Sequence, residues 1–237
     1  MDTAQMLREG RRALVLGGTG TVGGAVLREL ARRSVPAVFT YHRAEDKARA
    51  LALELGHAAA RVDLADAAAT AAFLDAQEAF DVAIHCAGVS AGLTLPEIDA
   101  AAWQEAMAVN VQSAFLLCRA VAARARRCDV VLVGGLDRAQ SLPLPAHFAA
   151  SQGALAALAM AVAHEVGRHD IRVNVVALGP LDGGISQGLA ARRRKDYETF
   201  SALRRPGTPD EAAKVIAWLA LENRFIQGKV LPVNGGI

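Results

Sequence analysis

The sequence has few aromatic residues, few cysteines and almost no net charge. Phe, Trp and Tyr make up 5% of the 237 residues, whereas hydrophobic residues of all kinds make up 53%. A core built mainly from Ala, Val and Leu suits close packing of helices on a sheet, and this composition argues against a disordered chain. The formal net charge of +2 is too small to indicate a nucleic-acid-binding protein.

The cysteines Cys86, Cys118 and Cys128 are odd in number and have no metal-ligand spacing. We therefore expect buried thiols in a reduced cytosolic protein, and no metal site. No basic segment followed by an apolar one opens the sequence as a leader would. The longest uncharged stretch, residues 139–163, contains two prolines and several polar residues, so no membrane span is expected there. These absences predict a cytoplasmic protein that contacts neither nucleic acid nor membrane.

Short apolar segments alternate with helical ones along the whole chain. Continuously apolar strands separated by helices indicate a parallel sheet covered on both faces. We expect one Rossmann-type, doubly wound α/β domain over residues 1–237, with seven strands. The expected strands lie in RALVLGG, VPAVFTY, HAAARVDL, DVAIHCAG, CDVVLVGG, DIRVNVVALGP and GKVLPVNGG.

Four of the expected helices have specific limits. They cover about 66–79, 99–127 and 146–167, together with TPDEAAKVIAWLAL, in which Thr208 is the expected N-cap and Pro209 the first helical residue. The least regular region, 179–207, is expected at the carboxyl ends of the strands, where sheets of this kind bind ligands.

The segment VLGGTGTVGG follows the first strand and opens the first helix, with Gly17, Gly20 and Gly23 three residues apart. Glycines in this place permit a tight turn and let backbone N–H groups reach a pyrophosphate at the positive end of a helix. Thr19 and Val22 lie within the same loop. The alternative is a glycine turn that only packs the helix on the strand.

The end of the second strand bears on the choice of nucleotide. It reads TYHR, without the carboxylate that would bind the ribose 2′-OH of NAD, and Arg43 beside His42 can pair with a 2′-phosphate. We therefore expect NADP(H), although Arg43 could also be an exposed residue at a helix start. Asp63 suits an adenine amino group. The backbone of Ala87 and Gly88 is expected to pass close to the ribose.

Together these segments resemble the short-chain dehydrogenase/reductase (SDR) family over nearly the whole chain, nearest to the 3-oxoacyl-ACP reductases. The family segment N-N-A-G is matched by His85-Cys86-Ala87-Gly88, its structural Asn by Asn110, and its closing segment by GKVLPVNGG. The resemblance adds positions near Asp63 and in the segment after the sixth strand. The expected cofactor site is then Gly17, Thr19, Gly20, Val22, Gly23, His42, Arg43, Asp63, Leu64, Ala87, Gly88, Gly179 and Leu181.

The catalytic positions implied by the resemblance are substituted. Phe148 stands at the place of the family's proton-donating Tyr, Gln152 at that of its Lys and Gly135 at that of its Ser, so only Asn110 is retained. Gly183 stands where a Thr usually contacts the nicotinamide end. A phenyl ring has no ionisable hydrogen, and loss of a general acid costs about 10²–10⁴ in rate. We expect the nucleotide to bind, although weakly, and the usual proton route to be absent.

Other residues near the substituted positions could supply a proton. His147 is expected at a helix start facing solvent, His85 is expected to be structural, and the Ser151 hydroxyl is expected to bond back to its helix. Asp137 and Asp182 lie on loops, and the sequence does not place their carboxylates.

Three functions remain open. In the first, the chain is a non-catalytic SDR-like subunit, alone or as the partner of an active ketoreductase, in a homo- or hetero-tetramer joined through the helices at 99–127 and 146–167. Alternatively it is an NADPH-dependent ketoreductase of β-ketoacyl-ACP or polyketide substrates with unusual proton delivery, or an NADPH-responsive regulator. Basic residues could receive an acidic carrier protein or be solvated helix ends. They are Arg124, Arg126, Arg127 and Arg168, with a second cluster at 192–195.

Overall fold

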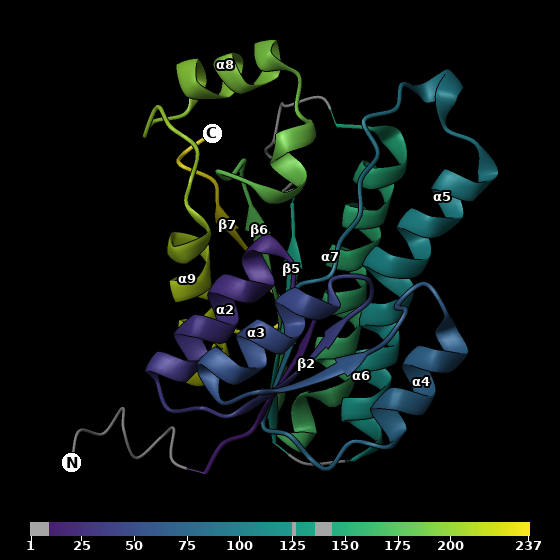
Figure 1. Cartoon of the computed structure of the whole chain (residues 1–237), viewed down its shortest axis with the longest axis vertical. Helices are drawn as coiled ribbons and strands as arrows, with labels where there is room; N and C mark the ends of the chain where they lie inside the picture. Colours follow the sequence, from purple (N-terminus) through teal and green to yellow (C-terminus); the bar gives the residue numbers. More distant parts are fainter. Residues whose placement is uncertain (1–9, 125–126, 136–143) are drawn as a thin grey trace.

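The computed structural model describes residues 10–124, 127–135 and 144–237 (Figure 1). These residues form a seven-stranded sheet with the strand order β3-β2-β1-β4-β5-β6-β7, in which all neighbours run parallel. The order reverses between β1 and β4, so the sheet has a switch point there. The predicted doubly wound α/β fold is confirmed. The strands are β1 (Ala13–Leu16), β2 (Ala37–Tyr41), β3 (Ala58–Arg61), β4 (Val82–His85), β5 (Cys128–Gly134), β6 (Ile171–Leu178) and β7 (Val230–Val233).

Helices cover both faces of the sheet (Figure 1). One face carries α2 (Thr21–Arg32), α3 (Glu45–Leu55) and α9 (Pro209–Leu221). The other carries α4 (Ala67–Asp75), α5 (Ala100–Met107), α6 (Ser113–Ala123) and α7 (Ala146–Val166). Helix α8 (Ala191–Phe200) lies beyond the carboxyl ends of the strands. Short helical turns are η1 (Leu95–Glu97), η2 (Ala108–Gln112), η3 (Gly167–His169) and η4 (Gly184–Gly188).

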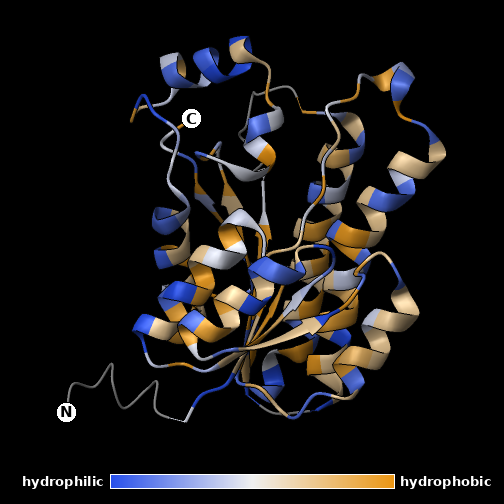
Figure 2. Ribbon diagram, in the orientation of Figure 1, coloured by the Kyte–Doolittle hydropathy of each residue, from blue (hydrophilic) through white to orange (hydrophobic). Residues whose placement is uncertain are grey.

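The core lies in two layers, one on each side of the sheet. Alternation along β1 directs Val15 into the layer under α2 and α9, and Leu14 and Leu16 into the layer under α6 and α7. Figure 2 shows the corresponding hydrophobic colouring along the central strands. Small residues such as Ala159 and Ala163 let α7 approach the sheet closely, as the composition predicts.

Several predicted helix limits are confirmed and others need correction. Thr208 is the N-cap of α9, and its hydroxyl accepts a hydrogen bond of 3.2 Å from the Glu211 N–H. Helix α7 covers nearly the predicted range. The long helix predicted over 99–127 runs unbroken from Ala100 to Ala123, with the π-helical turn η2 between α5 and α6. The helix predicted over 66–79 is shorter, because it ends at Asp75.

The expectation that residues 179–207 are irregular is wrong in part, because they contain η4 and the ten-residue helix α8. Two contacts hold this segment on the fold. The Tyr197 hydroxyl donates to the Asn234 carbonyl oxygen at 2.7 Å, and the Arg194 guanidinium lies 3.6 Å from the Asp182 carboxylate. Tyr197 is 1% exposed, so its phenol anchors α8.

Two helical stretches, Ala100–Ala123 and Ala146–His169, are long and apolar enough to cross a membrane by length and composition alone. The core helices of soluble proteins pass the same test. In this fold α7 packs on β6 and α6 and contributes Leu155 to the core. The two stretches are therefore weak evidence for a membrane protein, and the expected absence of a membrane contact stays a prediction.

Candidate functional site

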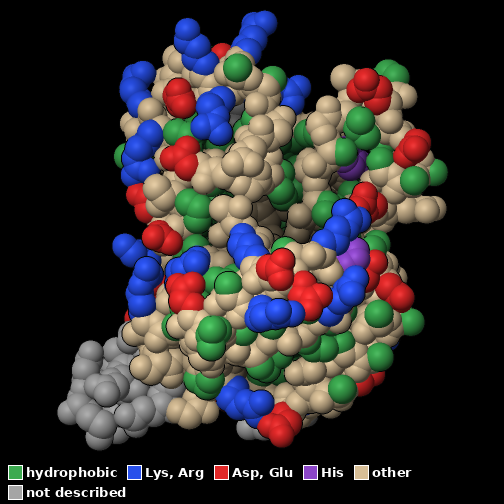
Figure 3. All heavy atoms as spheres, in the orientation of Figure 1, with side chains coloured by type: hydrophobic (Ala, Val, Ile, Leu, Met, Phe, Trp, Pro, Cys, Tyr) green, Lys and Arg blue, Asp and Glu red, His purple; other side chains and the backbone are tan. Residues whose placement is uncertain are grey.

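A cavity of about 800 Å³ opens at the carboxyl ends of the strands. Figure 3 shows the molecule hollowed between the part that carries α8 and the part that carries α5. The cavity brings together residues from the β1–α2 loop, the segments after β4, β5 and β6, and the start of α7. Predicted site residues that line it are Thr19, Gly20, Val22, Ala87, Gly88, Asn110, Gly135, Phe148, Gln152, Gly179 and Leu181.

The glycine loop is shaped by close backbone approach. Gly17 has φ +82°, and a Cβ atom there would lie 2.8 Å from the Cα of Ala87. A Cβ atom at Gly23 would collide with the Gly17 carbonyl oxygen. The Gly17 N–H donates to the Thr40 hydroxyl at 3.0 Å, which fixes the loop to β2. The conformation of the loop therefore requires Gly17 and Gly23. Helix α2 begins at Thr21, and its first residues Thr21 and Val22 line the cavity. The first N–H groups of a helix have no partner within it.

The predicted nucleotide-recognition residues after β2 and β3 lie outside the cavity lining. The His42 Nε2 is 3.7 Å from the Asp63 Oδ2, and Asp63 also accepts from the Ala65 N–H at 3.0 Å. Arg43 is exposed, and within the described part of the chain its guanidinium has no hydrogen bond or ion pair. Lys47, in the first turn of α3, lines the cavity but was not among the predicted site residues. Its position four residues after Arg43 is the sequence signal that could have indicated it.

Phe148 and Gly135 fit together sterically. The phenyl ring is 7% exposed and forms part of the cavity wall. A Cβ atom at Gly135 would lie 3.2 Å from its Cζ, which is tighter than ordinary van der Waals contact. The ring therefore adjoins the space that a serine side chain at 135 would enter.

The Gln152 side chain is bound within the protein. Its Oε1 accepts from the Gly135 N–H at 2.9 Å, and its Nε2 donates to the Ser151 hydroxyl at 3.3 Å. The amide is 6% exposed and joins the end of β5 to α7. A neutral group in this place cannot lower the pKa of a neighbouring phenol as an ammonium does.

Asn110, in the π-helical turn η2, is bound in the same network. Its Oδ1 accepts from the Val89 N–H at 2.8 Å, and its Nδ2 donates to the Val89 carbonyl at 3.0 Å and to the Ser151 hydroxyl at 2.9 Å. Ser151 in turn donates to the Phe148 carbonyl at 2.7 Å, so the predicted bond back to the helix is confirmed. Asn110 thus holds the segment after β4 against α7.

A family model described as enoyl-(acyl carrier protein) reductase matches residues 19–237. The chain belongs to the SDR family. It is 31% identical over 244 residues to the uncharacterized oxidoreductase YjdA of Bacillus subtilis, covering 94% of this chain and 95% of that one. It is 28% identical over 229 residues to the cyclic-di-GMP-binding biofilm dispersal mediator protein of Escherichia coli, covering 95% and 96%.

Solved structures of other family members match the whole SDR fold. The structure of BdcA in complex with NADPH superposes with a TM-score of 0.90 at 25% identity, covering 98% of this chain and 96% of that chain. The 3-oxoacyl-[acyl-carrier protein] reductase of Brucella melitensis superposes with a TM-score of 0.87 at 26% identity, covering 100% and 96%.

Neither histidine near the SDR site lines its cavity. The prediction that His147 faces solvent is wrong, because it is 2% exposed and its Nε2 accepts from the Ala91 N–H at 3.4 Å across the segment after β4. The Ser113 hydroxyl donates to a backbone carbonyl, so His85 Nε2 donates to that hydroxyl at 2.6 Å. Burial lowers the pKa of His85 to about 4, so it is neutral at pH 7 and structural, as expected. Asp182 pairs with Arg194, and Asp137 lies outside the described residues.

The cysteine expectation needs one correction. Cys118 and Cys128 are buried as expected, whereas Cys86 is only half-buried and lines the cavity. Burial raises the pKa of Cys86 to about 12, so its thiol is neutral at pH 7 and a weak acid. Across the residues that the structure places, no three His, Cys, Asp or Glu side chains gather where they could hold a metal ion.

The basic residues considered for carrier docking lie at the amino ends of the strands, opposite the cavity. Arg124 donates to the carbonyl oxygens of Leu74 and Gln77, and its guanidinium lies 5.3 Å from the Phe80 ring centroid. It therefore stabilises the end of α4. Arg127 lies 3.5 Å from Asp170, Arg168 is exposed in η3, and Arg126 lies outside the described residues.

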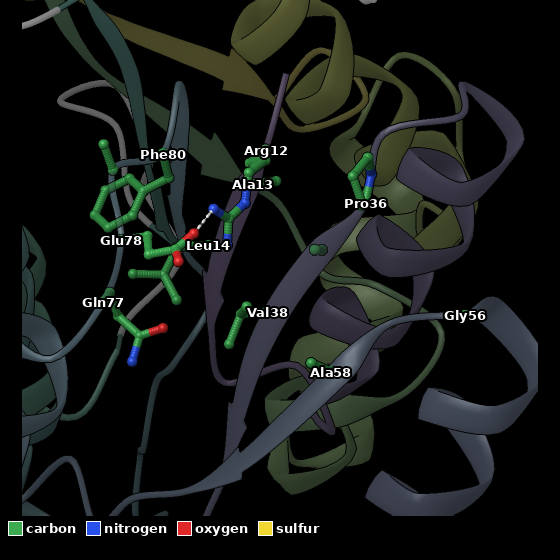
Figure 4. Close-up of a pocket in the computed structure, with 12 residues that line it drawn as sticks. Arg12, Ala13, Leu14, Pro36, Val38, Gly56, Ala58, Gln77, Glu78 and Phe80 are labelled. Atoms are coloured by element: carbon green, nitrogen blue, oxygen red, sulfur yellow. Dashed lines mark hydrogen bonds and ion pairs between the residues drawn. The ribbon is translucent and has the colours of Figure 1, made fainter. Parts of the chain in front are cut away.

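A smaller hollow of about 210 Å³ also lies at the amino ends of β1 and β2 (Figure 4). Arg12 and Glu78 point toward one another there and form an ion pair. Since this hollow is at the end of the sheet opposite the glycine loop, it is separate from the candidate site.

Proposed function

We propose that this chain binds NADP(H) in the cavity and does not reduce carbonyls by the route of its family. The glycine loop supports nucleotide binding, because it packs closely on Ala87 and the start of α2, Thr21 and Val22, lines the cavity. The start of a helix favours a phosphate group. The NADPH complex of the similar protein BdcA supports the choice of nucleotide. Arg43 and Lys47 are cations near the end of β2 that can pair with a 2′-phosphate.

The expected loss of carbonyl reduction follows from the part of the cavity wall formed by Phe148, Gln152 and Gly135. Of the described lining residues, only Cys86, Lys47 and Arg193 carry ionisable side chains. The thiol is a weak acid, and a guanidinium does not give up its proton near neutral pH. Lys47 belongs to α3, on the face of the sheet opposite α7. Loss of the general acid lowers the rate about 10²–10⁴-fold, and loss of an oxyanion donor about 10²–10³-fold.

The test combines binding with turnover on the same preparation. NADPH should show heat on titration, and it should bind more tightly than NADH. Binding should be weaker than in family members that keep the lysine, because Gln152 offers no charged donor. Incubation with NADPH and a panel of β-ketoacyl thioesters and quinones should leave the absorbance of the reduced nicotinamide unchanged. Steady oxidation of NADPH by any of these substrates would refute the proposal.

We further propose that the chain assembles with other SDR subunits, an active ketoreductase among them, through α5–α6 and α7. Small exposed residues along α7 permit close contact with a helix of another subunit. They are Ala150, Gly153 and Ala157. Trp103 and Phe115 are apolar side chains left 44% exposed on α5 and α6. Purification from the native host, followed by mass spectrometry of the intact assembly, should show a tetramer that includes a second SDR chain. A monomer, or this chain alone, would contradict the mixed assembly.

Two alternatives each have one supporting observation. Similarity to the Brucella melitensis 3-oxoacyl-ACP reductase favours a ketoreductase with unusual proton delivery, for which the turnover test above is decisive. A carrier-protein partner would then use a surface nearer the cavity than Arg124 and Arg127. Similarity to the Escherichia coli dispersal mediator favours a regulator that responds to NADPH. For a regulator, cofactor titration should change the assembly state.

A further inference from the structure

We propose that the cavity also binds a small organic anion with an apolar body, and that Arg193 of α8 binds the carboxylate of this ligand. The proposal rests on the proposed function, in which NADP(H) takes the side of the cavity formed by the glycine loop. It assigns a ligand class to the remaining side, which lies between α8, the segment after β4 and the start of α7.

The charges that line the cavity are of one sign. Among the lining residues that the structure describes, Lys47 and Arg193 are the charged side chains, and none is Asp or Glu. The two cations come from different walls, Lys47 from α3 beside the glycine loop and Arg193 from α8 beside Leu189. Because the described lining holds no carboxylate to neutralise these cations, the cavity attracts an anion. A charge-assisted bond to a carboxylate is about twice as strong as a neutral one.

Arg193 is directed at the cavity by the way α8 is anchored. Arg193 and Tyr197 are four residues apart and so lie on the same face of the helix. Tyr197 is buried and donates to the Asn234 carbonyl, which turns this face toward the protein. Arg194 is held by Asp182. Arg193 is half-buried and, within the described residues, makes no hydrogen bond or ion pair of its own. Helix α8 is therefore fixed on the fold, and the Arg193 guanidinium is left available to a ligand.

The walls around Arg193 are apolar. The phenyl ring of Phe148 replaces a phenol, so the wall can contact a hydrocarbon body without donating a hydrogen bond to it. Figure 3 shows Lys and Arg side chains gathered over α8 above this hollow. An aliphatic or aromatic carboxylate matches a guanidinium beside such walls. The apolar side chains that line this part of the cavity are Leu93, Leu95, Leu144, Pro145, Phe148, Ile185 and Leu189.

Octanoate and octanamide are suitable probes, because they share an eight-carbon body and differ in charge. Calorimetry on the full chain with saturating NADPH should show octanoate binding about tenfold more tightly than octanamide, the difference expected for one charge-assisted bond. In Arg193→Gln the two probes should bind within about twofold of each other. Arg193→Lys should restore part of the preference. The matched control is Arg192→Gln, which removes an exposed cation from the same turn of α8 and should keep the preference.

Equal binding of the two probes by the wild-type chain would overturn the proposal, as would no binding of either. A preference for octanoate that survives Arg193→Gln would also overturn it. If Arg193→Gln weakens NADPH binding instead, Arg193 binds a cofactor phosphate and the inference fails while the proposed function stands. If the wild-type chain binds no NADPH but, titrated without the cofactor, still prefers octanoate through Arg193, the proposed function fails and the inference stands.

Discussion

Restoring the family's catalytic residues tests whether this site lacks only its reactive groups. The changes are Phe148→Tyr, Gln152→Lys and Gly135→Ser, made singly and together. Phe148→Tyr alone should give almost no carbonyl reduction, because an isolated phenol with a pKa of about 10 is a poor acid at neutral pH. Adding Gln152→Lys should produce measurable turnover. The triple variant should gain about 10²–10³-fold more from the added hydroxyl.

The structure also sets a stability cost for each change. Gln152→Lys removes the acceptor of the Gly135 N–H, at 2.9 Å, and costs about 1 kcal/mol for the lost bond. It also buries an ammonium at a position that is 6% exposed, so binding of the nicotinamide ribose should stabilise it. Gly135→Ser places a Cβ atom 3.2 Å from the Phe148 Cζ and should cost about 1–3 kcal/mol through overpacking. A typical domain tolerates such losses.

Two measurements on each variant check this reasoning. Urea unfolding gives the stability with and without NADPH, and oxidation of NADPH by a β-ketoacyl thioester gives the activity. Turnover by Phe148→Tyr alone at the level of the triple variant would refute the role assigned to Gln152. A folded, NADPH-binding triple variant without activity would show that the cavity no longer holds a carbonyl at the nicotinamide.

Further predictions concern assembly, pH and the buried charges. A Cβ atom at Gly153 would meet nothing within 4 Å, so Gly153→Leu should leave the chain folded. In sedimentation, Gly153→Leu should disrupt the assembly and Gly153→Ala should not. An unchanged assembly mass for Gly153→Leu would exclude α7 as the interface. Burial lowers the pKa of His85 from 6.5 to about 4, so on acidification the imidazole is protonated in the unfolded chain before it is in the folded one. The free energy of unfolding should therefore fall by about 3 kcal/mol as the pH drops from 6.5 to 4. His85→Gln should flatten this loss in urea unfolding between pH 7 and pH 4.5, and an unchanged slope would contradict the assignment. Asp129→Asn breaks the buried pair with Arg172, at 2.7 and 3.0 Å, and should cost about 3 kcal/mol or more by the same assay, unlike the exposed control Asp210→Asn.

The elements with strong local signals could be predicted from the sequence. Apolar runs, most of which end at glycines, located the strands, and Thr208 followed by Pro209 located the start of α9. Helix α8 was missed because ARRRKDYETF has no apolar stripe, and only Tyr197 in it is buried. Its position depends on contacts with the distant residues Asp182 and Asn234.

The site residues, too, could be predicted only where the sequence signal is local. The positions of Phe148 and Gln152 follow from their spacing on one helix, which the sequence displays. The burial of His147 depends on the segment after β4, which crosses over α7 and is remote in sequence. Likewise, Lys47 was not singled out from the sequence, and Arg193 was left in a basic cluster that was either a docking surface or solvated. Only the folded chain shows that both residues line one cavity.

The substituted positions are coupled to one another. Without a side chain at Gly135, the Phe148 ring packs against the end of β5, and the backbone N–H at 135 is satisfied by the Gln152 amide. Ser151 then takes bonds from both Gln152 and Asn110, so the polar groups of this wall are paired within the protein. A site that had only lost its acid would leave donors and acceptors unmatched at these places. Because these polar groups are paired and the Phe148 ring lines the cavity, we interpret the cavity as a binding site for an apolar group.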